Sequence, residues 1–532
     1  MIAVSDEWKV KQTDRLVPEG FVEIRYWLTD PGVQREAVAT DNEHAYFSKT
    51  TQVTSIADKE DPLYATTERN LWVLDGSMEL VSDSTYGDTG YVSGALSNGS
   101  GSFDTIQTIT LSFESVHENV LPGMSIVWSD RYDEYATRFR IRAYQGSTLL
   151  NERLVENNDT VESLVEMDIS GYDRITVEVL AWCLPYRRAR CKEIRLGMVQ
   201  TIHKEELLGF EHTQSVDLLS GALPKNAVTF RLANVDGRWN PENPTGMEQY
   251  LLERQELTVR YGIDIDGTIE WIKAGTFYVS EWQTPSNGLE AIFTARDLIE
   301  FLNDVYTGPR VGSLYSIAEA AIQQANLPLD ASGSVRYRID SSLANYSTDL
   351  TADDTEYTIA EILQLAANAA CCVMYQNRSG ILCIEPLRTT YSGYAVTQHI
   401  SYSHPEYIIS KELKAVDVNE GLKVIENAPS GEVQTVRNPL IQLEQQADMV
   451  GGWIAQYLKS RKMISGTFRA DPRLDALDTI AVESKYGLNN AVILTDLTYT
   501  FSGAFHGKYI GRVVEFPPDY PFAGELHAGE WR

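Results

Sequence analysis

The segment VTFRLANVDGRWNPENP, residues 228–244, decides which class of fold the chain is expected to adopt. Its first half alternates apolar and polar residues, and its second half concentrates Asn, Asp, Gly and Pro. The alternating apolar positions on the two sides of this turn-rich run are Phe230, Leu232, Leu257, Val259 and Tyr261. A period of two bounded by turn residues predicts strands joined by turns. The region contains no catalytic constellation, which indicates a role in assembly rather than in chemistry.

Four blocks follow one another here: FRLANVDGRWNPENP (230–244), LLERQELTVRYG (251–262), GTFYVSEW (275–282) and TARDLIEFL (294–302). In this order they resemble the first tail-tube-like barrel of phage tail hub proteins, which are baseplate or tail-tip components. Two later blocks resemble the closing barrel of the same proteins: FRADPRLDALDTIAV (468–482) and VILTDLTYTFSGAFHGKY (492–509). The resemblance covers most of the chain and rests on the order and spacing of these blocks.

The fold that this resemblance implies is mainly β with α+β parts. Its expected parts are a first tube-like β-barrel split between 1–76 and 198–305, an inserted β-sandwich of jelly-roll type at 77–197, a small mixed α/β domain at 306–400, a second tube-like β-barrel with a long helix at 401–515, and an extended C-terminal tail at 516–532. The insert resembles the carbohydrate-binding modules that phage hub proteins often carry.

The function implied by the resemblance is structural. Three copies would form a ring that closes the distal end of the tail tube, adapts sixfold to threefold symmetry and anchors receptor-binding or fibre proteins. A hexameric distal tail protein and the tape-measure protein are the implied neighbours. The expected location is the distal tail tip or baseplate of a virion assembled in the host cytoplasm, with DNA passing through the lumen without specific binding.

The charge of the chain fits a protein that does not hold nucleic acid. The 75 acidic residues exceed the 45 basic ones, and the net charge is -30. Binding to phosphates needs a basic surface that releases counterions, which an acidic chain does not supply. We therefore expect acidic residues to be enriched along the lumen of the ring, although a solvated acidic surface that keeps the protein soluble explains the charge equally well. A chain of 532 residues is long enough for three to five domains.

Six short alternating segments between residues 109 and 196 predict the antiparallel sandwich of the insert. Four aromatic residues in it are candidate platforms for stacking a sugar: Tyr132, Tyr135, Trp182 and Tyr186. Packing in the core is the competing interpretation for each of them. The basic run PYRRARC, 185–191, is either an interface contact or a solvated edge. The alternative function is accordingly a carbohydrate-binding surface or adhesion protein that binds a host polysaccharide.

Helical periods mark the mixed domain and the last part of the chain. Thr358 and Glu361 fit a capping box at the start of one helix, which is followed by a hairpin with its turn at 377–380. A long helix is expected at 442–462, and close packing is one reason for Gly451 and Gly452 inside it.

Catalytic and metal-binding patterns are missing from the sequence. The eight histidines are scattered, and the chain has no HExxH, GxSxG or phosphate-loop motif. The five cysteines form no CxxC pair and are expected to be reduced. A polar loop at Asp236, Asn240, Glu242 and Asn243 departs from the calcium-loop pattern and is expected to be a turn. We expect no enzyme activity, no cofactor, no metal and no membrane segment, so a cell-wall hydrolase is the weakest alternative.

Overall fold

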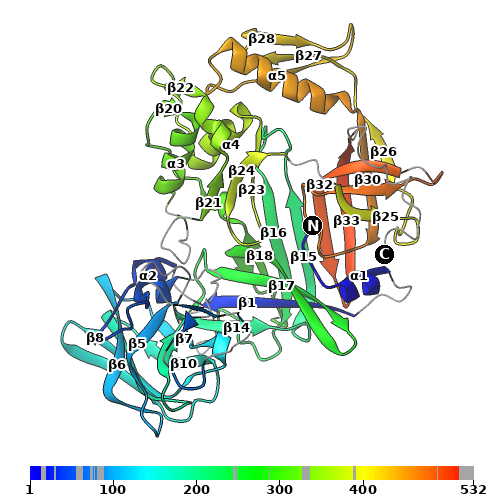
Figure 1. Ribbon diagram of the computed structural model, residues 1–532. Helices are drawn as coiled ribbons and strands as arrows, with labels where there is room; N and C mark the ends of the chain where they lie inside the picture. The colour runs from blue at the N-terminus through cyan, green and yellow to red at the C-terminus, as the bar shows by residue number, and fades with distance from the viewer. Residues whose placement is uncertain are drawn as a thin grey trace.

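The computed structural model is built around one large β-sheet to which the other parts of the chain attach (Figure 1). The insert lies at one end of this sheet, and a small helix-containing domain lies beside its middle. The structure describes residues 1–13, 19–28, 31–55, 64–66, 68–71, 76, 78–80, 89–243, 247, 250–286, 288–325, 327, 336–387, 391–487 and 489–514. The expected C-terminal tail, 516–532, lies outside these residues.

The central sheet has 13 strands and combines both ends of the chain. Its first half has the order β14-β1-β17-β18-β19-β16-β15, and the second half continues as β32-β33-β30-β26, with β31 pairing with β32 and β25 with β31. The first-half strands are β1 (Gly20–Leu28), β14 (Met198–Ile202), β15 (Leu207–Ser215), β16 (Lys225–Ala233), β17 (Glu256–Ile265), β18 (Thr268–Gln283) and β19 (Glu290–Arg296). The second-half strands are β25 (Tyr391–Val396), β26 (Glu406–Ile409), β30 (Lys462–Arg469), β31 (Thr479–Glu483), β32 (Asn489–Phe501) and β33 (Phe505–Val513).

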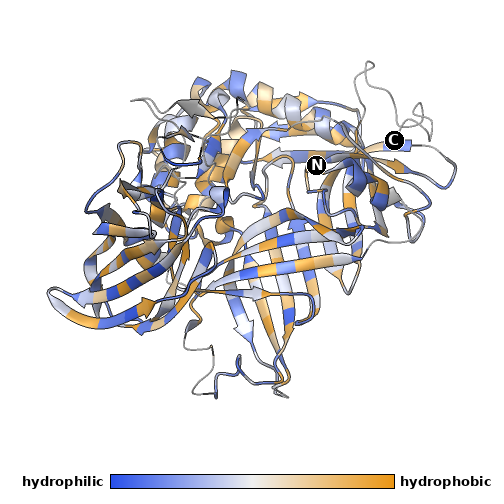
Figure 2. Ribbon diagram, turned by 60° about the horizontal axis from the view of Figure 1, so that its bottom comes forward, coloured by the Kyte–Doolittle hydropathy of each residue, from blue (hydrophilic) through white to orange (hydrophobic). Residues whose placement is uncertain are grey.

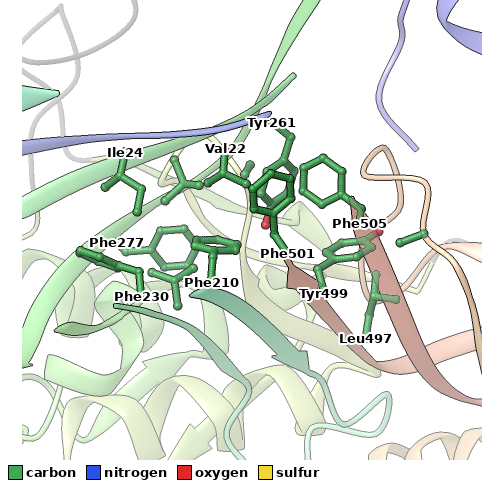
Figure 3. Close-up of a cluster of buried hydrophobic side chains, with 14 of the residues drawn as sticks. Val22, Ile24, Phe210, Phe230, Tyr261, Phe277, Leu497, Tyr499, Phe501 and Phe505 are labelled. Atoms are coloured by element: carbon green, nitrogen blue, oxygen red, sulfur yellow. The ribbon is translucent and has the colours of Figure 1, made fainter. Parts of the chain in front are cut away.

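Antiparallel pairing of β15 with β32 joins the two halves, and its register sets Phe210 opposite Phe501. The hydrophobic core is shared as well, because Tyr261 of the first half contacts Phe505 and Tyr499 of the second, with ring centroids 5.0 and 6.0 Å apart (Figure 3). The two barrels expected from the sequence therefore share one sheet and one core. Among the described residues, backbone pairing does not close either half by itself.

The alternation predicted for residues 228–261 is confirmed. Val228, Phe230 and Leu232 of β16 are buried, whereas Thr229 and Arg231 point to the opposite face of the sheet. Figure 2 shows the same alternation of hydrophobic and hydrophilic residues along many of the strands. Helix α1 (Asp6–Thr13) packs beside β17 and buries Trp8 in the shared core.

The insert is a sandwich whose sheets have the orders β2-β6-β11-β8-β9 and β10-β7-β13, with an additional pair β12-β5. Its strands are β2 (Val38–Asp41), β5 (Tyr91–Leu96), β6 (Ser102–His117), β7 (Leu121–Val127), β8 (Ala136–Gln145), β9 (Thr148–Val155), β10 (Glu162–Ile169), β11 (Tyr172–Trp182), β12 (Arg188–Cys191) and β13 (Glu193–Leu196). The helical turns are α2 (Pro31–Glu36), η1 (Thr50–Thr54) and η2 (Asp130–Tyr132). A short parallel pair, β3 (Tyr64–Ala65) with β4 (Glu79–Leu80), lies in the segment before β5.

The insert begins earlier than the residue 77 expected from the sequence. Val33, Ala39 and Val53 are buried in its core, and β2 pairs with β6. The early start was not visible in the sequence because β2 is only four residues long and its partner strand begins about 60 residues later. Contiguity in the chain suggested that these residues belong to the first barrel.

The mixed domain contains helices α3 (Leu314–Gln324) and α4 (Ile359–Ala369). Its short strands and turns are β20 (Val311–Ser313), β21 (Tyr337–Ile339), β22 (Ser347–Asp349), β23 (Cys372–Gln376), β24 (Leu382–Pro386), η4 (Leu298–Phe301) and η5 (Ser341–Asn345). The predicted capping box is confirmed, since Thr358 and Glu361 bond reciprocally at the start of α4. The predicted hairpin β23-β24 is also present.

The long helix α5 (Glu444–Lys459) was expected in the second barrel but packs elsewhere. It lies on the small sheet of β28 (Lys423–Glu426), β27 (Leu413–Val418) and β29 (Glu432–Val436), and both contribute to the core of the mixed domain. Close packing of Gly451 is confirmed, because a Cβ there would stand 2.8 Å from Ile425 Cγ1, whereas a Cβ at Gly452 would meet nothing within 4 Å. The mainly β fold class with an α+β part is confirmed. No helix within the described ranges is long and apolar enough to cross a membrane.

Candidate functional site

The aromatic residues proposed for sugar stacking do not form one exposed platform. Trp182 is 2% exposed and meets Trp128 edge-on, with ring centroids 6.1 Å apart. Its Nε1 donates a hydrogen bond to Glu134 Oε2 at 2.8 Å. The face of Trp182 is therefore not accessible to a ligand, and core packing explains this residue.

Tyr132 covers two buried ion pairs. The Cζ atoms of Arg187 and Arg190 lie 5.8 and 5.1 Å from its ring centroid. Arg187 Nε donates to Glu134 Oε1 at 2.7 Å, and Arg190 Nη1 donates to Glu68 Oε1 at 2.8 Å. Two arginines of the basic run 185–191 are thus internal ties of the insert, so that part of the run is neither a solvated edge nor an exposed contact.

The Glu68 pair fixes the segment around residue 68 to the insert. Burial by itself would raise the pKa of Glu68, but the hydrogen bond and charge of Arg190 outweigh burial and hold the pKa below its usual range. The Glu68 carboxylate also accepts a bond from the backbone N–H of Arg188 at 2.7 Å. A cavity of about 30 Å³ beside Tyr132 and Trp128 has room for a water molecule but not for a sugar ring.

The other two candidates differ in accessibility. Tyr135 packs partly against the core of the insert, while Tyr186 is 41% exposed with Arg69 Cζ 5.3 Å from its ring centroid. Tyr186 also has a left-handed backbone, with φ of 59°. Sugar binding stays a prediction, and Tyr186 is the most exposed residue of the four.

Arg378 forms five side-chain hydrogen bonds at the centre of the molecule, and no pattern in the sequence pointed to it. It lies in the β23-β24 turn and reaches between the two halves of the sheet. Its Nε bonds the carboxylate of Asp475 at 2.8 and 2.9 Å. Its Nη1 donates to the carbonyl oxygen of Lys273 in β18, and its Nη2 donates to those of Pro472 and Leu474, all at 2.9 Å. One side chain from the mixed domain therefore bonds both halves.

A buried histidine stands next to this connection. His212 Nδ1 lies 2.6 Å from the hydroxyl of Tyr261, and Nε2 lies 2.8 Å from Asn226 Oδ1. Burial lowers the pKa of His212 to about 4, so the ring is neutral at pH 7. Because Nε2 faces an amide oxygen, it carries the proton, and Nδ1 accepts from Tyr261. His212 serves as a satisfied core residue at the junction.

A cavity of about 560 Å³ lies where the first half, the second half and the β23-β24 hairpin meet. Its walls include Arg338 bonded to Glu385 and Arg378 bonded to Asp475. Asp297, also in the wall, caps η4 through Ile299, and burial raises its pKa to about 7. These groups are arranged as structural ion pairs and a helix cap. The described residues contain no group of three or more potential metal ligands.

The exposed face of the sheet continues across the junction and is rich in hydroxyl groups. In one row, Thr213 of β15 faces Thr498 of β32, which faces Lys508 of β33, which in turn faces Thr467 of β30. On strands β15, β16, β19, β30, β32 and β33, the acidic residues of this face are Glu211, Glu290 and Asp496, and Arg231, Arg296, Arg469 and Lys508 lie on the same face. The acidic surplus of the chain is therefore not concentrated on this part of the face.

Among solved structures, the chain is similar to several tail proteins. The chain is similar to the 43 kDa tail protein of prophage MuSo2 from Shewanella oneidensis, with 13% identity over 60% of this chain and 96% of that one and a TM-score of 0.43. A tail protein from Neisseria meningitidis MC58 has 13% identity over 59% of this chain and 93% of its own, with a TM-score of 0.41. Prophage tail protein gp18 from Listeria monocytogenes EGD-e has 10% identity over 59% and 91%, with a TM-score of 0.34.

No family model and no curated protein sequence matches the chain. These three solved structures are described as tail proteins, two of them from prophages. Their TM-scores lie below 0.5, so these likenesses alone assign no function to the chain.

Proposed function

We propose that the chain is a structural, non-enzymatic subunit of a phage or phage-derived tail hub. The observation that carries this proposal is the β15-β32 pairing, which makes two sheet halves in one chain into a single curved surface with a common core. Three copies would form a ring with threefold symmetry that presents six such halves around its axis, and these six halves would match the six subunits of a hexameric tube. The sheet would then continue from half to half around the ring.

In this role the ring closes the distal end of the tail tube and adapts sixfold to threefold symmetry. The hexameric distal tail protein and the tape-measure protein are its neighbours, and receptor-binding or fibre proteins attach to parts that project from the ring. The insert is the candidate for such attachment, because it is a separate sandwich at one end of the sheet (Figure 1). The protein is then a component of the virion tail tip or baseplate.

The exposed face of the sheet is the proposed lining of the bore. Short hydroxyl side chains such as Thr213, Thr498 and Thr467 leave it smooth, and its charges of both signs are interspersed. Such a face offers no basic track for the phosphates of passing DNA. If this face lines the bore, the lumen is hydroxyl-rich and of mixed charge, whereas the sequence predicts an acidic one.

Oligomeric state and assembled structure test the proposal. Light scattering after size exclusion should give three times the chain mass of 59.7 kDa, about 179 kDa. Electron cryomicroscopy of the particle should show three copies around the tail axis with β15 and β32 at the bore. A monomer at micromolar concentrations, together with a peripheral position in the particle, would refute it.

A further inference from the structure

Strand β26 is an exposed apolar edge at one end of the central sheet. It pairs with β30 on one side and is the last strand of the path on the other. Tyr407, Ile408 and Ile409 are 43%, 51% and 56% exposed, although they follow one another along a strand. Consecutive residues point to opposite faces, so the strand leaves apolar surface uncovered on both faces. Among the described residues, no strand pairs with its outer edge.

The surface around the Ile409 end of this strand is basic. Lys462 opposes Ile409 in the register, and Arg461 Nε donates to the carbonyl oxygen of Ser410, the residue after Ile409, at 2.9 Å. Arg461 and Lys462 are both exposed. In a chain with a net charge of -30, two exposed cations beside exposed isoleucines indicate a surface for an acidic partner.

The opposite end of the same sheet has the complementary character. Strand β10 of the insert contacts β14, the last strand at that end. Its outward residues are Glu162, Leu164, Glu166 and Asp168, which alternate with buried ones. Leu164 is 50% exposed among these three carboxylates. An acidic surface with an apolar centre therefore lies at one end, and a basic surface with an apolar centre at the other.

We infer that the β26 end of one copy docks on the β10-β14 end of a second copy, head to tail. This inference rests on the ring proposed above and names the two surfaces that hold it together. Two different patches in contact form a heterologous interface, which closes into a ring when the rotation between copies is right. Ile409 would meet the surroundings of Leu164, and Lys462, which lies opposite Ile409 in the register, would meet the carboxylates of β10.

Two kinds of variant of the full chain test the docking. Ile409→Asp places a charge at the apolar centre of the β26 end, and Val235→Asp does the same at a residue that is 83% exposed in a turn of the first half. We expect Ile409→Asp to raise the dissociation constant of the trimer at least tenfold in mass photometry, with unchanged circular dichroism and melting temperature. Val235→Asp should assemble like the unmodified chain.

Charge reversal gives an independent measurement. Lys462→Glu should weaken assembly because it sets like charges against β10, and adding Glu166→Lys should restore it at least in part. A trimer that is insensitive to Ile409→Asp and Lys462→Glu overturns this inference and leaves the proposed ring intact. An unmodified chain that stays monomeric overturns the ring itself. If Ile409→Asp fails to fold, the Lys462→Glu variant with and without Glu166→Lys tests the docking instead. An assembly defect of Lys462→Glu that Glu166→Lys does not repair would rule out the β10 surface as its partner.

Discussion

Replacing Arg378 by alanine should separate the contribution of the junction from that of the rest of the fold. The guanidinium group bonds Asp475 and three carbonyl oxygens, and it comes from a hairpin that belongs to neither half of the sheet. Its removal leaves a carboxylate and three acceptors without their donor. Water can reach some of them through the adjoining cavity, which is about 560 Å³.

The burial of the ion pair sets the expected loss of stability in Arg378→Ala. The Arg378 side chain is 8% exposed and that of Asp475 is 28% exposed. Removing one partner of a buried ion pair costs about 3–5 kcal/mol, and the access of water to Asp475 favours the lower end of this range. Arg378→Lys keeps the charge but not the planar fork, so it should lose about half as much, because an ammonium group cannot bond carbonyl oxygens on both halves and the carboxylate at once.

The matched control is Arg338→Ala. Arg338 pairs with Glu385 at 3.1 Å in the neighbouring strand, but its side chain is 52% exposed, so its loss should cost less than about 1 kcal/mol. Urea unfolding followed by tryptophan fluorescence measures all three variants. Equal destabilisation by Arg378→Ala and Arg338→Ala, or a loss below about 1 kcal/mol for Arg378→Ala, would refute the view that this arginine ties the halves together.

Further predictions concern pH, the long helix and the insert. Burial raises the pKa of Asp297 to about 7 from an ordinary value of 3.8, so the folded state binds this proton more tightly than the unfolded state does. Asp297 therefore adds about 4 kcal/mol to the free energy of unfolding as the pH falls from 8 to 4. The Asp297→Asn variant should lack this gain when urea titrations at pH 8 and pH 4 are compared. Burial lowers the pKa of His212 to about 4 from 6.5, so its effect on stability has the opposite sign. About 3 kcal/mol of the free energy of unfolding is present above pH 6.5 and is lost as the pH falls through 4. The His212→Asn variant should not show this loss at low pH. Gly452→Ala should raise the free energy of unfolding by about 1 kcal/mol, whereas Gly451→Ala should not, because its Cβ would stand 2.8 Å from Ile425; equal melting temperatures of the two variants would contradict this. If the insert binds host polysaccharide, Tyr186→Ala should reduce retention on it while folding is unchanged, and equal retention would remove Tyr186 from the candidates.

The alternating pattern of the sequence determined the strands and the class of fold. Positions such as Phe230 and Leu232 are apolar at every second residue, and a strand with one buried face needs that pattern wherever it lies. The capping box of Thr358 and Glu361 was equally local, because its two hydrogen bonds form within one turn of helix. Features decided by neighbours within a few residues could thus be predicted from the sequence.

The tertiary structure alone decided which strands meet and which polar groups are buried. Phe210 and Phe501 are opposite each other in the pairing that joins the halves, although almost 300 residues separate them, and neither flanking sequence specifies the partner. Trp182 was a candidate platform by type, yet its burial depends on Trp128 and Glu134 from other segments. Arg378 lies in an ordinary polar turn and gains its role from Lys273 and Asp475. Local sequence patterns determine the helices and strands. Burial and strand pairing depend on contacts between distant segments, so only the assembled core determines what individual side chains do.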